Sequence, residues 1–134
     1  MTKIESNFSP VEASQEKVFA FLSDFNNYQK LMPSQVSDWW SISDEAKMKI
    51  QGLGALHLKK NETHENSYIK IIPVGSTPVD LYLEWFIEPD GNTCKVSAVI
   101  NADLNMMMRM VATKPLQSLA DYMASQVNKA IKEV

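Results

Sequence analysis

Hydrophobic and polar residues alternate through most of the middle of the chain. From residue 36 to residue 102 the alternating runs are short, and turn sequences such as Pro89-Asp90-Gly91-Asn92 separate them. Alternation with a period of two is typical of strands that bury one face of a sheet. Because short turns join neighbouring antiparallel strands, the pattern predicts an antiparallel meander with one buried face.

The parity of these runs predicts which side chains face the interior. Leu83 and Trp85 share one parity, whereas Glu84 and Glu88 share the other. Successive side chains of a strand point to opposite faces, so Leu83 and Trp85 are expected on the buried, concave side. The same reasoning assigns four further residues to that side: Leu56, Leu58, Val96 and Ala98.

Two short helices are predicted near the N-terminus, after an edge strand over residues 3–11. Ser14 is a suitable N-cap, and apolar residues recur at helical spacing from Val18 to Phe25. The segment from Tyr28 to Met32 predicts a second short helix, which Pro33 ends.

The last predicted element is a long helix that begins at Asp103 or Asn105 and reaches Lys132. At about 1.5 Å per residue it would be roughly 40 Å long. Pro115 lies inside this helix and removes a backbone donor, so a kink or a short break is expected near Thr113-Lys114. The apolar stripe of the helix has the period of 3.6 residues. It consists of Leu116, Leu119, Ala120, Met123, Val127, Ala130 and Ile131.

Composition and charge restrict the function classes. The length of 134 residues fits one domain over residues 1–134. The formal net charge of −3 provides no excess of positive charge that would attract nucleic acid or an anionic membrane. Cys94 is the only cysteine, which suits a reducing compartment. Residues 1–10 lack the apolar core of a signal peptide, and no stretch has the length of a spanning helix. We expect a cytoplasmic protein with no nucleic-acid partner and no stable membrane insertion.

Few residues could carry catalysis or bind a metal. His57 and His64 are the only histidines, and the potential donors around His64 match no known ligand spacing. Glu84 has the parity of the outward-facing residues, and Asp103 has the simpler role of a helix cap. The sequence contains no nucleophile elbow, no phosphate-binding glycine loop and no zinc-protease motif. We therefore expect no catalytic residues, no metal and no cofactor.

Two segments carry a resemblance to a known superfamily. The segment VEASQEKVFAFLSDFNNYQKLMP, residues 11–33, resembles the N-terminal signature of the START and birch-pollen-allergen-like proteins, which include the polyketide cyclases and lipid-transport proteins. The segment ADLNMMMRMVATKPLQSLADYMA, residues 102–124, resembles their final strand and C-terminal helix. The resemblance implies an α+β helix-grip fold, in which a seven-stranded antiparallel curved sheet surrounds a long C-terminal helix and two short helices follow the first strand. No set of catalytic residues carries over to this sequence.

The resemblance also implies an internal cavity for a small hydrophobic molecule. Met107, Met110 and Val111, at the start of the long helix, are expected to line it, because methionine adapts to apolar partners of varied shape. Core filling or a dimer contact would explain the same methionines, so monomer and homodimer both stay open. Phe21 and Leu119 are also expected in the lining.

The adjacent residues Trp39 and Trp40 point to opposite faces if they lie in a regular strand. At most one of them can then line the cavity. Trp40 shares its parity with Val36 and Ile42, and we expect Trp40 in the lining.

Three functions are compatible with the sequence. The first is binding or transport of a lipid, quinone or polyketide-like molecule in the cavity. The second is an enzyme of the polyketide cyclase or hydratase type, and the third is a partner-binding module whose cavity is filled by its own side chains. Because no acid–base pair is visible in the sequence, binding is the leading hypothesis.

Overall fold

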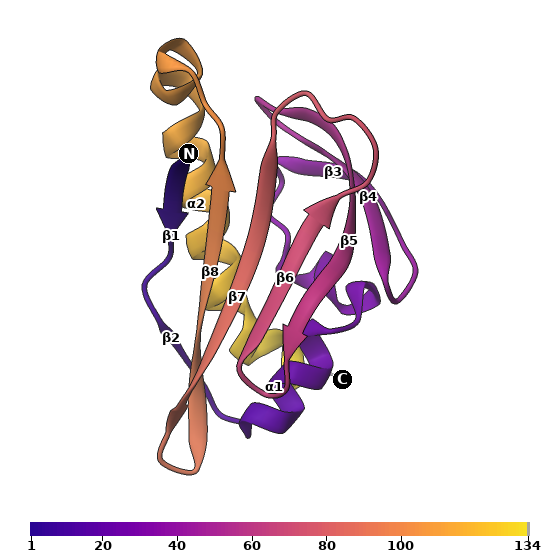
Figure 1. Ribbon diagram of the computed structural model, residues 1–134. Coiled ribbons are helices and arrows are strands. Elements are labelled where there is room, and N and C mark those ends of the chain that lie inside the picture. Colours follow the sequence, from indigo (N-terminus) through magenta and orange to yellow (C-terminus); the bar gives the residue numbers. More distant parts are fainter. Residues whose placement is uncertain (134) are drawn as a thin grey trace.

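The computed structural model describes residues 1–133, so Val134, the last residue of the expected domain, lies outside the described residues. Figure 1 shows a curved sheet with α2 running along it and the short helices at one end. In chain order the elements are β1 (Thr2–Glu5), β2 (Ser9–Val11), α1 (Gln15–Leu22), the 3-10 helix η1 (Phe25–Leu31), β3 (Val36–Ser41), β4 (Glu45–Ile50), β5 (Gly54–His64), β6 (Tyr68–Pro73), β7 (Leu81–Asp90), β8 (Thr93–Ala102) and α2 (Met106–Ile131).

The strands form one antiparallel sheet in the order β1-β8-β7-β6-β5-β4-β3, and β2 also pairs with β8. This confirms the predicted antiparallel meander and the two short helices that follow the N-terminal strands. The sheet has eight strands instead of the seven expected. The difference arises because the expected edge strand over residues 3–11 is divided into β1 and β2, which pair with successive parts of β8.

Ser6 lies at the point where the N-terminal strand divides. Its backbone N–H donates to the carbonyl of Ala98 at 2.9 Å, and its Oγ accepts the N–H of Ala98 at 2.9 Å. The Ser97 hydroxyl in turn donates to the Ser6 carbonyl at 2.9 Å. The serine side chain thus takes a place that a strand carbonyl would otherwise fill, and it satisfies a buried donor while the chain bends.

Side-chain caps set the beginnings of the helices. Ser14 caps α1, as predicted, by accepting the Lys17 N–H at 3.2 Å. Asn105, one of the two candidates from the sequence, caps α2 by accepting the Met108 N–H at 2.9 Å. Each cap satisfies a backbone donor that has no partner within its helix.

The helix α2 is continuous through Pro115, so the short break expected near Thr113-Lys114 does not occur. Proline removes the donor that would bond the carbonyl of Val111, and Val111 lies on an exposed part of the helix. Tertiary packing of the buried residues that follow Pro115 stabilises the helix on its C-terminal side. The Gln35 amide also donates to the Pro115 carbonyl at 2.7 Å, which ties this turn to the segment before β3.

The core lies between the sheet and the apolar stripe of α2, which packs against β8, β1, β2 and η1. Among residues 1–133, no helix combines the length and the apolar character needed to cross a membrane. The predicted stripe is confirmed, with Ile131 only partly buried. Its fully buried members are Leu116, Leu119, Ala120, Met123, Val127 and Ala130.

We predict that Ser6→Ala lowers the free energy of unfolding by about 1–3 kcal/mol, because it leaves the buried N–H of Ala98 without an acceptor. Chemical denaturation of the variant measures this loss. Ser118→Ala, at an exposed position of α2, is the matched control and should change stability by less than about 0.5 kcal/mol. Equal stability of the two variants would contradict the role assigned to Ser6.

Candidate functional site

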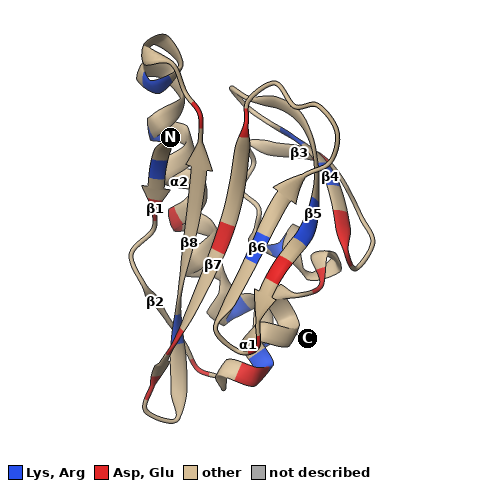
Figure 2. Cartoon of the chain, viewed as in Figure 1, with Lys and Arg blue, Asp and Glu red and all other residues tan. Residues whose placement is uncertain are grey.

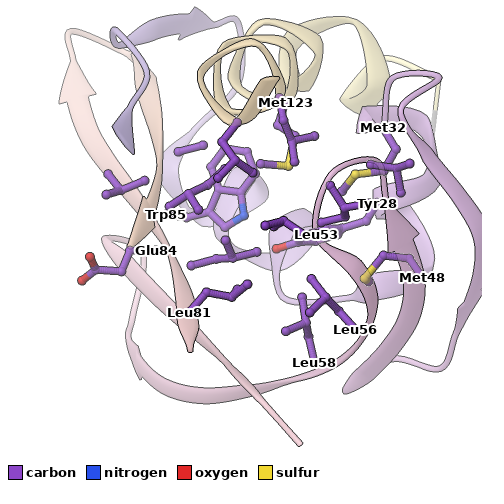
Figure 3. A pocket seen from close by; sticks show the side chains of 18 of the residues that line it. Tyr28, Met32, Met48, Leu53, Leu56, Leu58, Leu81, Glu84, Trp85 and Met123 are labelled. Atoms are coloured by element: carbon purple, nitrogen blue, oxygen red, sulfur yellow. The ribbon is translucent and has the colours of Figure 1, made fainter. Parts of the chain in front are cut away.

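An apolar cavity lies inside the molecule, between the concave face of the sheet and α2 (Figure 3). Its walls come from η1, from strands β3 to β5, β7 and β8, and from the middle of α2. Tyr28 and Met32 close it from the η1 side, Met48 from β4, and Met123 from α2. The cavity therefore brings together residues that are far apart in the sequence.

The position of α2 explains why a cavity forms there. The helix packs against β8, β1 and β2, which lie at one side of the sheet, and against η1. Strands β4 and β5 curve away from this contact, so their inward side chains have to fill a wider space. Met48, Leu56 and Leu58 point into that space from these two strands (Figure 3).

The cavity is nearly filled by its own side chains. The free space inside it is only about 30 Å³, enough for about two water molecules. A larger molecule needs side chains to move. Three of the movable side chains are the methionines Met32, Met48 and Met123, whose unbranched chains repack at small cost.

Tyr28 contributes a hydroxyl group to this apolar interior. It donates to the carbonyl of Leu22 at 2.6 Å, and burial raises the pKa of the Tyr28 hydroxyl above its ordinary value, so it stays neutral. Its ring packs edge-on against Trp85 at 6.3 Å and is nearly parallel to Trp39 at 6.5 Å, both between ring centroids. These contacts hold the ring at the cavity wall.

Glu84 is the only charged residue among those that border the cavity in the described chain, and its carboxylate points away from it (Figure 3). There it accepts hydrogen bonds from the Tyr68 hydroxyl at 2.6 Å and from the Asn101 amide at 2.8 Å. Burial, followed by the neighbouring Glu84 carboxylate, raises the pKa of Tyr68 above its ordinary value. The outward orientation of Glu84 agrees with its strand parity.

The structure brings six of the twelve expected lining residues to the cavity: Leu56, Leu58, Leu83, Trp85, Ala98 and Leu119. Phe21 and Val96 are buried, but they pack in the core outside the cavity. Phe21 belongs to α1, which contacts β7 and β6 near the end of the sheet. Helical periodicity identified Phe21 as buried, yet it could not tell which part of the core the residue enters.

Trp40 does not line the cavity, and the expectation from its parity is wrong. Its side chain is 46% exposed, with Lys47 stacked over its ring, whereas Trp39 borders the cavity. The register of β3 shifts between Ser37 and Trp40, and Asp38 adopts a left-handed backbone conformation with φ of 56°. An irregularity of this kind inverts the parity of the residues that follow it.

The residues Met107, Met110 and Val111 are also placed away from the cavity, contrary to expectation. They lie on the first turns of α2, and all three side chains are largely exposed. Figure 1 shows these turns rising beyond the end of the sheet, where no strand faces them. The part of α2 that borders the cavity begins at Leu116, after the proline.

Sequence reasoning missed the contribution of η1 to the cavity. Phe25, Tyr28 and Met32 all border it, although they were expected only to form short helices. The available signal was the recurrence of an apolar residue at every third position before Pro33. Because η1 is a 3-10 helix, with three residues per turn, its buried side chains recur every third residue as Phe25, Tyr28 and Leu31.

No protein-family model matches the sequence, and a search of curated proteins finds no significant match. Solved structures do match over nearly the whole chain. A START superfamily protein from Mycobacterium smegmatis has a TM-score of 0.73 at 16% identity, covering 98% of this chain and 97% of its own. The fold is the START-like helix-grip fold.

Two further helix-grip structures resemble this chain. The KanY protein, solved by NMR, has a TM-score of 0.78 at 15% identity, covering 98% of this chain and 99% of its own. Norcoclaurine synthase from Thalictrum flavum, in complex with dopamine and hydroxybenzaldehyde, has a TM-score of 0.72 at 15% identity, covering 98% of this chain and 87% of its own. At these identities the likeness concerns the fold.

We predict that Tyr28→Phe lowers the free energy of unfolding by about 1–3 kcal/mol, because it removes the donor to the Leu22 carbonyl at the end of α1. Thermal and chemical denaturation measure the loss. Tyr122→Phe removes a hydroxyl from an exposed tyrosine of α2 and should be close to neutral. If the two variants unfold alike, the Tyr28 hydroxyl does not stabilise the cavity wall.

Proposed function

We propose that this protein binds a small, mostly apolar molecule, of the lipid, quinone or polyketide-like type, in the cavity between the sheet and α2. The observation that carries the proposal is the chemistry of the lining. Aliphatic, aromatic and methionine side chains surround the space, and the one charged residue at its border, Glu84, turns outward. Sites for small ligands are concave and mainly apolar, with few polar groups.

Binding requires the cavity to expand, because its free space of about 30 Å³ is too small for such a molecule. The three methionines in the lining provide the means. Met32 follows η1, Met48 lies on β4 and Met123 on α2, so a rotamer change at each would widen the space from a different side. Removing the apolar surface of the ligand from water supplies about 25 cal/mol per Å² to drive this rearrangement.

The small free space also favours a second candidate function. A helix-grip domain whose cavity is filled by its own side chains would act as a partner-binding module. A polyketide cyclase or hydratase-type enzyme has weaker support, because no acid–base pair faces the cavity among the described residues. Titration with apolar probes separates the binding protein from the module.

We predict that the wild-type protein binds cis-parinaric acid or a short-chain quinone analogue at micromolar concentration, and that Ala98→Leu weakens this binding at least about tenfold. Ala98 borders the cavity, so a leucine there occupies the space that the ligand needs. Fluorescence titration measures the affinity, and circular dichroism checks that the variant is folded.

Ala102→Leu is the matched control for this experiment. Ala102 lies on the same strand and the same face as Ala98 and is also buried, but it does not border the cavity. It should keep the wild-type affinity, and Met110→Arg, on the exposed turns of α2, should do the same. If neither probe binds the wild-type protein, the binding proposal fails and the partner-binding module replaces it.

A further inference from the structure

Four large apolar side chains are exposed together at the start of α2. Met106, Met107, Met110 and Val111, which we call the methionine tip, are 73%, 76%, 81% and 68% exposed. Single exposed apolar residues are ordinary on protein surfaces, whereas a contiguous group marks a surface that is covered in use. Met108, the fifth apolar residue of these turns, packs partly against the core and anchors them.

The tip is shaped as a projection and not as a groove. Asn105 caps α2 directly after the loop that leaves β8, and the first turns rise beyond the end of the sheet (Figure 1). The side chains of the tip can therefore insert into a deformable surface before the rest of the molecule contacts that surface.

The first turns of α2 carry positive charge only. Residues 104–120 contain two cationic residues, Arg109 and Lys114, and no acidic residue, in a chain whose net charge is −3, and the exposed Asp103 lies two positions before the cap Asn105. Figure 2 shows these first turns of α2 with blue segments and no red ones. Lys114 follows Met110 by four residues, about 6 Å further along the helix and away from the tip. The apolar residues of the tip lie next to the cationic Arg109 and Lys114. An anionic lipid surface has the complementary order, with phosphates above an apolar interior.

We propose that the methionine tip docks reversibly onto the headgroup region of an anionic membrane. Its methionines enter the boundary of the acyl chains, while Arg109 and Lys114 pair with lipid phosphates. Each cation close to such a surface contributes about fivefold in affinity. The net charge of the whole chain, from which no attraction to an anionic membrane was expected, does not decide the matter, because charges more than about 8 Å away are screened at physiological ionic strength.

A second copy of the chain is a poorer occupant of this surface. Stable protein interfaces bury about 800 Å² on each partner, which a projection of two helical turns does not offer. A symmetric contact between two tips would also bring their Arg109 and Lys114 side chains together. A lipid surface can deform around a projection, and its phosphates carry the charge opposite to that of Arg109 and Lys114.

The tip also lies beside an open groove between α2 and the turn that joins β4 and β5. Val111, Lys114 and Pro115 form one side of the groove, and Gln51 and Gly52 lie on the other. Docking would bring this groove to the lipid headgroups. Exchange of an apolar molecule between membrane and cavity at this place rests on the proposed function, whereas the docking itself does not.

Sedimentation with large unilamellar vesicles tests the proposal. The full chain should sediment with vesicles of 70% phosphatidylcholine and 30% phosphatidylserine. Binding should fall at least about tenfold on vesicles of phosphatidylcholine alone, or in 0.5 M salt. Met107→Ser/Met110→Ser removes apolar surface without changing charge and should weaken binding at least about tenfold, whereas Ile42→Ser, at an exposed apolar residue elsewhere, should not.

A charge pair of variants completes the test. Arg109→Glu/Lys114→Glu should abolish the preference for anionic vesicles, and Lys17→Glu/Lys129→Glu, with the same change in charge at exposed positions elsewhere, should preserve it. The docking proposal is overturned if the wild-type chain binds neither kind of vesicle, or if the tip variants bind as well as the controls. It is also overturned if the chain forms a dimer that the Met107→Ser/Met110→Ser variant abolishes, since the tip then contacts a second copy.

Failure of docking and failure of the proposed function are distinguishable. The Met107→Ser/Met110→Ser variant should keep its affinity for cis-parinaric acid, because neither residue borders the cavity. Vesicle binding without probe binding would retain the docking surface and remove the cavity proposal. Probe binding without vesicle binding would support the cavity proposal and overturn the docking proposal.

Discussion

The packing of the α2 stripe against one side of the curved sheet is the contact on which the rest of the structure depends. Leu116, Leu119 and Val127 are buried in it, and the helix meets β8, β1, β2 and η1. Because the helix lies toward that side, the opposite part of the concave face lies outside its main contacts. Side chains from β4, β5 and η1 occupy that space, and the cavity is the part that they leave open. The candidate site is thus a consequence of where the helix lies and does not require a dedicated motif.

Residues in regular elements were predictable from the sequence. The alternation around Trp85 identified the buried face of β7, including the outward carboxylate of Glu84, and the stripe from Leu116 to Ala130 identified the buried face of α2. Both predictions rest on a fixed period, which holds as long as the backbone is regular. Trp40 shows the limit, since the left-handed backbone at Asp38 shifts the register of β3 and places Trp39 inside instead.

The methionines at the start of α2 show a different limit. Their pattern is compatible with a buried helix face, but burial also requires another element opposite to them. The sequence does not state how far a helix extends past the end of a sheet, and Met107 and Met110 lie beyond that end. The cavity and the methionine tip are therefore two separate apolar surfaces on one helix, divided by Pro115. The first faces a small interior, and the second is exposed on the outside of the molecule.

Native mass spectrometry of the gently purified protein tests whether the cavity between the sheet and α2 holds an apolar ligand. If the cavity holds an apolar ligand, the spectrum should contain a species heavier than the chain by the mass of one small molecule. Denaturation should release that molecule into an organic extract. One such molecule per chain is expected, and it should be lost in the Ala98→Leu variant and retained in Ala102→Leu. A spectrum with the bare chain alone, before and after incubation with a total lipid extract, would contradict it.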